Sequence, residues 1–75
     1  MTLEDFVKRF AEEFDDTDSS LFTADANFHE FEEWSSLAAL SIIAMVDEEF
    51  DKSITGADIR SCKTINELYE LIQSK

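Results

Sequence analysis

The chain has 75 residues, of which 18 are acidic and 6 basic, and its formal net charge at pH 7 is -12. Such a surface repels a phosphate backbone, which excludes a nucleic-acid binder that works through phosphate contacts. Hydrophobic residues, among them seven Phe, make up 44% of the chain, which is too apolar for a disordered acidic tail. We therefore expect one small folded domain over residues 1–75.

The numbers of Gly, Pro, Cys and His residues limit the possible fold class and the cellular compartment. One Gly and no Pro leave few tight turns, which argues against an all-β fold. One Cys cannot form an internal disulfide, and together with one His it cannot supply a zinc site. The longest uncharged stretch, Trp34 to Val46, is too short to span a bilayer, and no basic segment precedes an apolar core at the N-terminus. We expect a soluble, intracellular, mainly helical monomer in the cytoplasm.

A first helix is predicted over residues 3–14. Thr2 is a favourable N-cap, and Asp5 three residues later completes a capping box in which Asp replaces the usual Glu. Apolar residues then recur at spacings of three and four, so they share an arc of about 100° on one helix face. These residues are Leu3, Phe6, Val7, Phe10 and Phe14.

Residues 15–34 show no sustained period, and a connection of this length in a small domain is expected to be pinned down or functional. Apolar side chains along it are expected to lie across the open end of a helical core and hold the connection in place, and we call them pins. They are Leu21, Phe22, Phe28, Phe31 and Trp34. A short helical turn is predicted near residues 27–31.

The second helix is predicted to begin at Ser35 or Ser36 and to end near Phe50. Its broader apolar face, assigned to the core, consists of Ala39, Ile42, Ile43, Val46 and Phe50. A second strip on roughly the opposite side consists of Leu37, Leu40 and Ala44, and continues one turn further as Asp47 and Glu48. A helix buried on both sides is one interpretation. The acids that end the strip favour the other, a strip that reaches solvent.

Two further helices complete the prediction. Thr55 is expected to cap a short third helix over residues 56–61, with Ile59 pointing inward, after a loop at 51–54. Thr64 to Glu67 reads as a capping box for a fourth helix that ends near Gln73. The buried stripe of that helix is Ile65, Leu68, Tyr69 and Ile72. The fold class is thus all-α, a small four-helix bundle of three main helices and a short third one, with a long loop between helices 1 and 2.

No enzyme constellation emerges from the sequence. His29 has no Ser or Cys partner placed by spacing, and a capped loop histidine is the simpler interpretation. Cys62 lies between apolar neighbours and is expected to be a small buried side chain. Asp16, Asp18 and Ser20 resemble the start of a calcium loop, but the central Gly and the final Glu are missing, which leaves only loose binding of divalent ions by clustered acids.

Two adjacent serines open the most apolar helix, although a helix cap needs only one. An N-cap and nothing more is the simplest interpretation of such a serine. A phosphate on Ser36, however, would meet unpaired backbone N–H groups and the positive end of the helix dipole. It would also stand beside the strip formed by Leu37, Leu40 and Ala44, where a partner could dock.

At this point the sequence resembles the acyl carrier protein family over nearly its whole length. In that family an Asp-Ser-Leu motif opens the second helix, and its Ser carries a 4′-phosphopantetheine arm. Ser35, Ser36 and Leu37 match the motif, with Ser35 in place of the usual Asp. The other matching segments are Asp47-Glu48-Glu49-Phe50, Ile54-Thr55-Gly56-Ala57-Asp58-Ile59 and Lys63-Thr64-Ile65.

The resemblance implies a discrete carrier protein and not an enzyme. A phosphopantetheinyl transferase would attach the arm from coenzyme A to Ser36, and the arm would present acyl or aminoacyl thioesters to biosynthetic enzymes with basic docking patches, as in fatty-acid or polyketide synthesis. Leu37, Leu40 and Ala44 would give short-range fit, and Asp47 and Glu48 would steer. The alternatives are a small acidic adaptor or inhibitor without a prosthetic group and, more remotely, a calcium-responsive helical protein.

Overall fold

The computed structural model describes residues 2–15 and 18–75, and over these residues it is helical without any strand. Extended pairing there amounts to one isolated bridge between Asn27 and Thr64. The elements in chain order are α1 (Leu3–Ala11), η1 (Ser19–Leu21), η2 (Phe28–Glu30), α2 (Ser36–Phe50), α3 (Gly56–Ser61) and α4 (Ile65–Ser74), of which η1 and η2 are single 3₁₀ turns. The predicted all-α bundle is confirmed.

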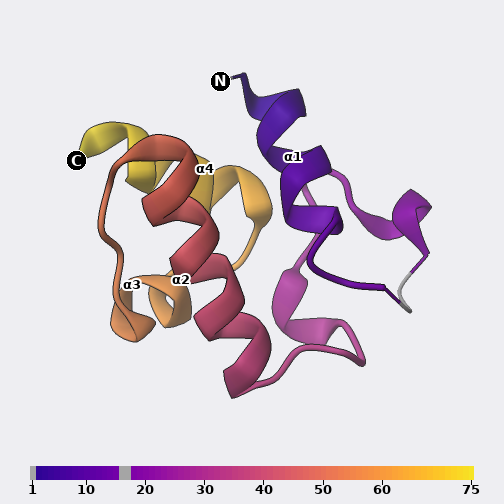
Figure 1. The fold of residues 1–75 in the computed structure, drawn as a ribbon. Coiled ribbons are helices and arrows are strands. Elements are labelled where there is room, and N and C mark those ends of the chain that lie inside the picture. Colours follow the sequence, from indigo (N-terminus) through magenta and orange to yellow (C-terminus); the bar gives the residue numbers. More distant parts are fainter. Residues whose placement is uncertain (1, 16–17) are drawn as a thin grey trace.

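The α-helices are arranged around α2 (Figure 1). In this view α2 runs through the middle of the molecule, with α3 beside its lower half and α4 behind its upper half. Helix α1 lies to the right, and the segment between α1 and α2 fills that side of the molecule. The start of α2, where the two serines lie, is therefore at one end of the bundle.

Helix α2 has the boundaries that the sequence predicts. Ser35 has extended backbone, and its side chain accepts a hydrogen bond from the Ala38 N–H at 3.3 Å, so it is the N-cap. At the other end Asp51 takes the left-handed conformation with φ of 55°, and its N–H donates to the Asp47 carbonyl. Asp is one of the few residues besides Gly that tolerate this conformation, which is how a chain with one Gly ends its longest helix.

Local caps also define the starts of α3 and α4. Thr55 and Asp58 form a complete capping box at α3, with the two reciprocal bonds at 3.1 and 3.0 Å. At α4 the box is incomplete: Thr64 accepts from the Glu67 N–H, but the Glu67 carboxylate accepts from the Lys63 N–H at 2.7 Å. Glu67 thus accepts from the N–H of the residue before the cap, next to the bridge between Asn27 and Thr64.

The end of α1 corrects the prediction, since the helix stops at Ala11 and not at residue 14. Beyond the Glu12 cap, the N–H groups donate three residues back, Glu13 to the Phe10 carbonyl and Phe14 to the Ala11 carbonyl. The chain therefore tightens as it leaves the helix. Phe14 is still buried, because this tightening turns its ring towards Phe22 and Trp34. Aromatic packing thus overrides the helical period at this end.

Phe10 is the centre of an aromatic cluster that holds the long connection in place. Its ring is fully buried. The distances from its ring centroid to the ring centroids of five aromatic neighbours are 5.5 to 6.5 Å. These neighbours are Phe6, Phe14, Phe22, Phe28 and Trp34. The predicted pins Phe22 and Phe28 are buried, and Phe31 and Trp34 pack against the core. The prediction of Leu21 as a pin is wrong, because η1 ends there and leaves its side chain 53% exposed.

Backbone bonds attach the same connection to α4. The Ile65 N–H donates to the Ala26 carbonyl at 3.3 Å, and the Asn66 N–H donates to the Ala24 carbonyl at 2.9 Å. These are two of the N–H groups that a helix start leaves without an internal partner. The predicted helical turn near residues 27–31 is present as η2, with Asn27 as its cap.

Helix α2 is buried on one side only. Its deepest residues are Ile42, Met45 and Val46, while the predicted core residues Ala39, Ile43 and Phe50 are half-buried and pack against the core. The sequence pattern omits Met45 from this face. Its side chain is 1% exposed, so the buried face is rotated slightly from the predicted one. The opposite strip reaches solvent, as the acids at its end indicated.

Removing the central ring tests the role of the aromatic cluster. We expect Phe10→Ala to lower the free energy of unfolding by about 3–5 kcal/mol, because a buried Phe leaves a large cavity. This is a substantial part of the stability of a small domain. The measurement is urea unfolding, with exposed Leu40→Ala as the control, which should change stability by no more than about 0.5 kcal/mol. Equal losses for both variants would contradict the assignment of Phe10 as the centre of the core.

Asp58 gives a pH-dependent prediction. Its pKa is lowered, first by the hydrogen bond from the Thr55 backbone N–H and then by the pairing with Lys75 at 3.2 Å. A carboxyl with a lowered folded-state pKa stabilises the fold above its unfolded-state pKa of about 3.9 and loses this effect as the pH falls through the folded-state value. We expect Asp58→Ala to lower the Tm at neutral pH and to do so progressively less below about pH 4.

The matched control is Asp25→Ala, which removes one charge from an exposed position whose side chain has no hydrogen bond or ion pair within residues 2–15 and 18–75. Thermal melts of the three proteins across the pH range measure the difference. A Tm loss for Asp58→Ala that stays constant or grows in acid would contradict the prediction.

Candidate functional site

The two serines at the start of α2 have different roles. Ser35 is the cap, with its side chain bonded to the Ala38 N–H. Ser36 is the first residue of the helix and is exposed, and within residues 2–15 and 18–75 its hydroxyl has no hydrogen-bond partner. The capping function is therefore complete without Ser36, whose hydroxyl is left accessible for another use.

A groove of about 390 Å³ opens beside Ser36. It brings together three separate parts of the chain: the end of the long connection, the first turn of α2 and helix α3. Its lining residues are His29, Trp34, Ser35, Ser36, Ala39, Gly56, Ile59 and Arg60. The sequence predicted the serines but gave no signal for Gly56 and Arg60, because only the packing of α3 against α2 brings them to this place.

His29 is a structural side chain, as the sequence suggested. Its Nε2 lies 2.8 Å from the Cys62 carbonyl oxygen and 3.2 Å from that of Ile59, and since both are acceptors this nitrogen must carry the hydrogen and donate. The ring satisfies carbonyl groups at the end of α3 and lies 5.4 Å from the Trp34 ring. His29 therefore joins the long connection to α3 and holds one wall of the groove.

Cys62 is buried, with 6% of its surface exposed, as predicted. Burial raises the pKa of its thiol, and the nearby Glu67 and Asp58 carboxylates raise it further, while a contact with the Ser61 hydroxyl acts in the other direction. Because the thiolate is the reactive form, this cysteine is a poor nucleophile.

Of the calcium-loop candidates, the structure describes Asp18 and Ser20. Asp18 accepts a hydrogen bond from the Ser20 N–H at 3.0 Å, and this bond lowers the pKa of its carboxyl. Asp16 lies outside the described residues. Over residues 2–15 and 18–75, no group of three or more His, Cys, Asp or Glu side chains is arranged to hold a metal ion.

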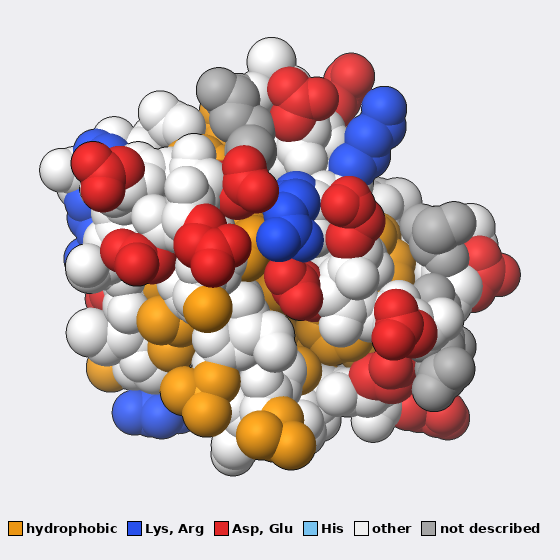
Figure 2. Space-filling model, in the orientation of Figure 1, with side chains coloured by type: hydrophobic (Ala, Val, Ile, Leu, Met, Phe, Trp, Pro, Cys, Tyr) orange, Lys and Arg blue, Asp and Glu red, His pale blue; other side chains and the backbone are white. Residues whose placement is uncertain are grey.

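The strip on α2 is an exposed surface that starts one residue after Ser36. Leu37 is 75% exposed and Leu40 is 60% exposed, and Ala44, Asp47 and Glu48 are exposed as well. Figure 2 shows hydrophobic side chains gathered on the lower half of this face, over α2, with acidic side chains above and to the right. Leu37 and Leu40 are three residues apart on one helix and so lie on the same face, and contiguous exposed apolar surface is a feature of interaction sites.

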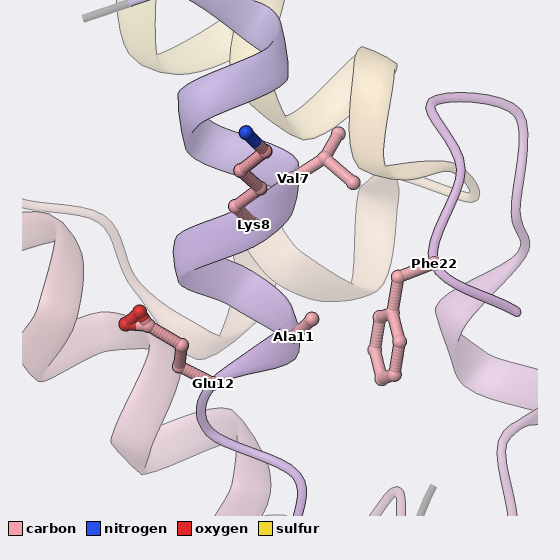
Figure 3. Close-up of a pocket in the computed structure, with 5 residues that line it drawn as sticks. All are labelled: Val7, Lys8, Ala11, Glu12 and Phe22. Atoms are coloured by element: carbon pink, nitrogen blue, oxygen red, sulfur yellow. The ribbon is translucent and has the colours of Figure 1, made fainter. Parts of the chain in front are cut away.

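A second pocket, of about 300 Å³, lies between α1 and the long connection (Figure 3). Val7 and Ala11 point across it towards Phe22, and Lys8 and Glu12 of the same helix also line it. Its apolar walls are side chains that also pack against the core. It offers neither a free hydroxyl nor a reactive thiol, so the groove at Ser36 is the better candidate site.

Comparison with known protein families gives a match over most of the chain. A family model described as "Phosphopantetheine attachment site" matches residues 4–72. Comparison with curated proteins gives no match. In the part of the chain that the structure describes, no helix is both long enough and apolar enough to cross a membrane.

The structure fits the group that this family carries. Attachment of 4′-phosphopantetheine needs a side chain that an outside enzyme can reach and that the fold does not use, and exposed, unbonded Ser36 meets both conditions in the described structure. The match covers far more than half of the chain. The chain therefore belongs to the phosphopantetheine-attachment family, whose members hold 4′-phosphopantetheine covalently and act as carriers, not as enzymes.

Proposed function

We propose that residues 1–75 form one carrier domain in which Ser36 anchors the 4′-phosphopantetheine arm. The observation that carries this assignment is the division between the two serines: Ser35 caps α2, and the hydroxyl of Ser36 is exposed and unbonded within the described residues. When attached, the arm supplies a thiol that holds an acyl or aminoacyl cargo as a thioester. The chain itself supplies the anchor and the surface that other enzymes recognise.

Loading takes place at the Ser36 oxygen. Ser36 Oγ loses its proton and forms a bond to phosphorus, while a P–O bond in the pyrophosphate of coenzyme A breaks and releases adenosine 3′,5′-bisphosphate. A phosphopantetheinyl transferase with Mg²⁺ supplies the catalysis. The role of Ser36 is positional: at the first turn of α2 its oxygen points away from the core and can enter the active site of the transferase.

The α2 strip is the proposed docking surface for the transferase and for the enzymes that load and use the cargo. Leu37, Leu40 and Ala44 supply short-range apolar contact next to the anchor, and Asp47 and Glu48 attract basic patches over a longer distance. Exposed charge pairs are individually weak, so partners can dissociate quickly. Fast exchange between enzymes is what a carrier needs.

The proposed carrier domain is a monomer in the cytoplasm. We expect a monomer, because a dimer formed through the exposed strip would cover the surface that partners must reach. We place it in the cytoplasm, where a chain with one unpaired cysteine stays reduced. Fatty-acid or polyketide synthesis is the class of pathway that we expect to use it.

Loading tests the anchor directly. We expect the chain, mixed with coenzyme A, Mg²⁺ and a broad-specificity phosphopantetheinyl transferase, to gain the mass of one phosphopantetheine by intact-mass spectrometry. Ser36→Ala should gain nothing, because it lacks the oxygen that accepts phosphorus. Ser35→Ala should still be loaded, although loss of the cap destabilises the helix by about 1 kcal/mol.

Ser35→Asp is the matched control, since Asp also caps a helix and restores the residue usual in the motif. We expect it to be loaded at least as fast as the wild-type chain. If several transferases leave the wild-type mass unchanged, the anchor assignment is wrong, and an acidic adaptor that binds its partner without a prosthetic group becomes the better description.

Charge reversal tests the docking surface. We expect Asp47→Lys with Glu48→Lys to lower kcat/KM for loading about tenfold at low salt, because steering by surface charge contributes roughly 10- to 1,000-fold to association. The salt dependence should become flatter. The control is Asp25→Lys with Glu70→Lys, which changes the net charge equally at exposed positions outside α2.

The control should keep most of the wild-type rate, and melting temperatures should be recorded for both double variants, because relief of self-repulsion can stabilise either. Equal rate losses for the two would show that total charge, and not the position of the acids on α2, sets the encounter.

A further inference from the structure

The groove beside Ser36 contains one cationic side chain, Arg60 of α3. It is exposed, and among the residues that the structure describes it has neither an ion-pair partner nor a side-chain hydrogen bond. Within the described residues Arg9 and Lys75 form ion pairs, so the guanidinium of Arg60 is available to an anion from outside the fold. The role inferred for this arginine rests on the proposed role of Ser36 as the anchor.

The guanidinium lies close to Gly56, one turn earlier on the same helix. A Cβ atom added at Gly56 would lie 3.4 Å from Arg60 Nη1, so the guanidinium lies over the bare backbone of Gly56. Gly56 and Arg60 both line the groove that Ser36 also lines. The side chain is therefore directed along the α3 wall of the groove.

The other basic side chains either form ion pairs or lie outside the groove at Ser36. Arg9 pairs with Glu13 and Glu49, and Lys75 pairs with Asp58. Lys8 lines the pocket on α1, and Lys52 and Lys63 do not line the groove at Ser36. Within the described part of the chain, Arg60 is thus the basic side chain that shares a cavity with the anchor.

We propose that Arg60 is a positioning residue that binds the phosphodiester of the arm once it is attached to Ser36. A phosphodiester on Ser36 Oγ places a negative charge at the edge of the groove, and the planar guanidinium offers two parallel N–H donors to phosphate oxygens. The interaction holds the start of the arm against α3, and because it is exposed it weakens in salt. It leaves the Leu37 and Leu40 strip uncovered for partners.

The test compares the ¹⁵N-labelled chain before and after loading by NMR, with intact mass proving that one arm is attached. The arm is left without cargo, so the phosphodiester is its only charged group apart from the thiol. For the wild-type chain we expect loading to shift the Arg60 Nε–H and Gly56 amide signals in addition to the Leu37 amide signal. Raising the salt concentration should reverse the shifts on α3 and leave the Leu37 shift in place.

Two substitutions of Arg60 and one control at Lys63 separate the effect of the guanidinium from the effect of net charge. In Arg60→Gln, loaded to completion with excess transferase, the Gly56 shift should be lost and the Leu37 shift retained, and Arg60→Lys should restore part of the Gly56 shift. Lys63→Gln removes the same charge from an exposed position outside the groove and should behave as the wild-type chain.

The possible failures are distinguishable. A loaded wild-type chain with unmoved Arg60 and Gly56 signals overturns the role of Arg60 and leaves Ser36 as the anchor. A wild-type chain that takes up no arm overturns the anchor, and the role of Arg60 with it. Because the Arg60 Nε–H signal is read in the wild-type chain, poor loading of Arg60→Gln does not prevent a decision.

Discussion

The packing of aromatic rings around Phe10 determines where the functional end of the molecule lies. Among its described residues, the connection between α1 and α2 has single turns of helix, so its path depends on side-chain contacts and on its backbone bonds to α4 rather than on helical periodicity. Phe28 and Trp34 from that connection lie 5.5 and 6.5 Å from the Phe10 ring and 4.8 Å from each other. Since Trp34 immediately precedes the cap Ser35, the cluster fixes the point at which α2 begins. The exposure of Ser36 is therefore a consequence of core packing.

The charge of the chain and the one-sided burial of α2 are connected. A helix with Leu37 at 75% and Leu40 at 60% exposed gains less from burial than its composition allows, and it presents an apolar surface that invites self-association. The net charge of -12 opposes association between copies. Asp47 and Glu48 lie directly beyond the apolar strip, so the docking of basic partners that we propose would use the same charge.

Local chemistry made some features predictable, and tertiary packing hid others. The boundaries of α2 and α3 follow from Ser35 and Thr55, whose capping bonds depend only on residues three positions away. The end of α1, the exposure of Leu21 and the burial of Met45 depend on which rings and helices meet in space, so no local pattern signals them. The groove could not be predicted for the same reason: its walls come from positions as distant as His29 and Arg60. Ser36, the proposed anchor, could be selected from the sequence because the family motif includes it and the adjacent Ser35 suffices as the cap.

A protein that carries thioesters must not react with its own cargo, and the structure provides for this. An exposed thiolate near the arm would accept the acyl group by exchange, but Cys62 is buried and its pKa is raised, which keeps it as the unreactive thiol. The Nε2 of His29 donates to two carbonyl oxygens, so this imidazole, which lines the groove beside Ser36, is held in place as part of the fold. Burial thus keeps the one thiol of the chain from exchange with a cargo, and in the proposed function the reactions of that cargo belong to the partner enzymes.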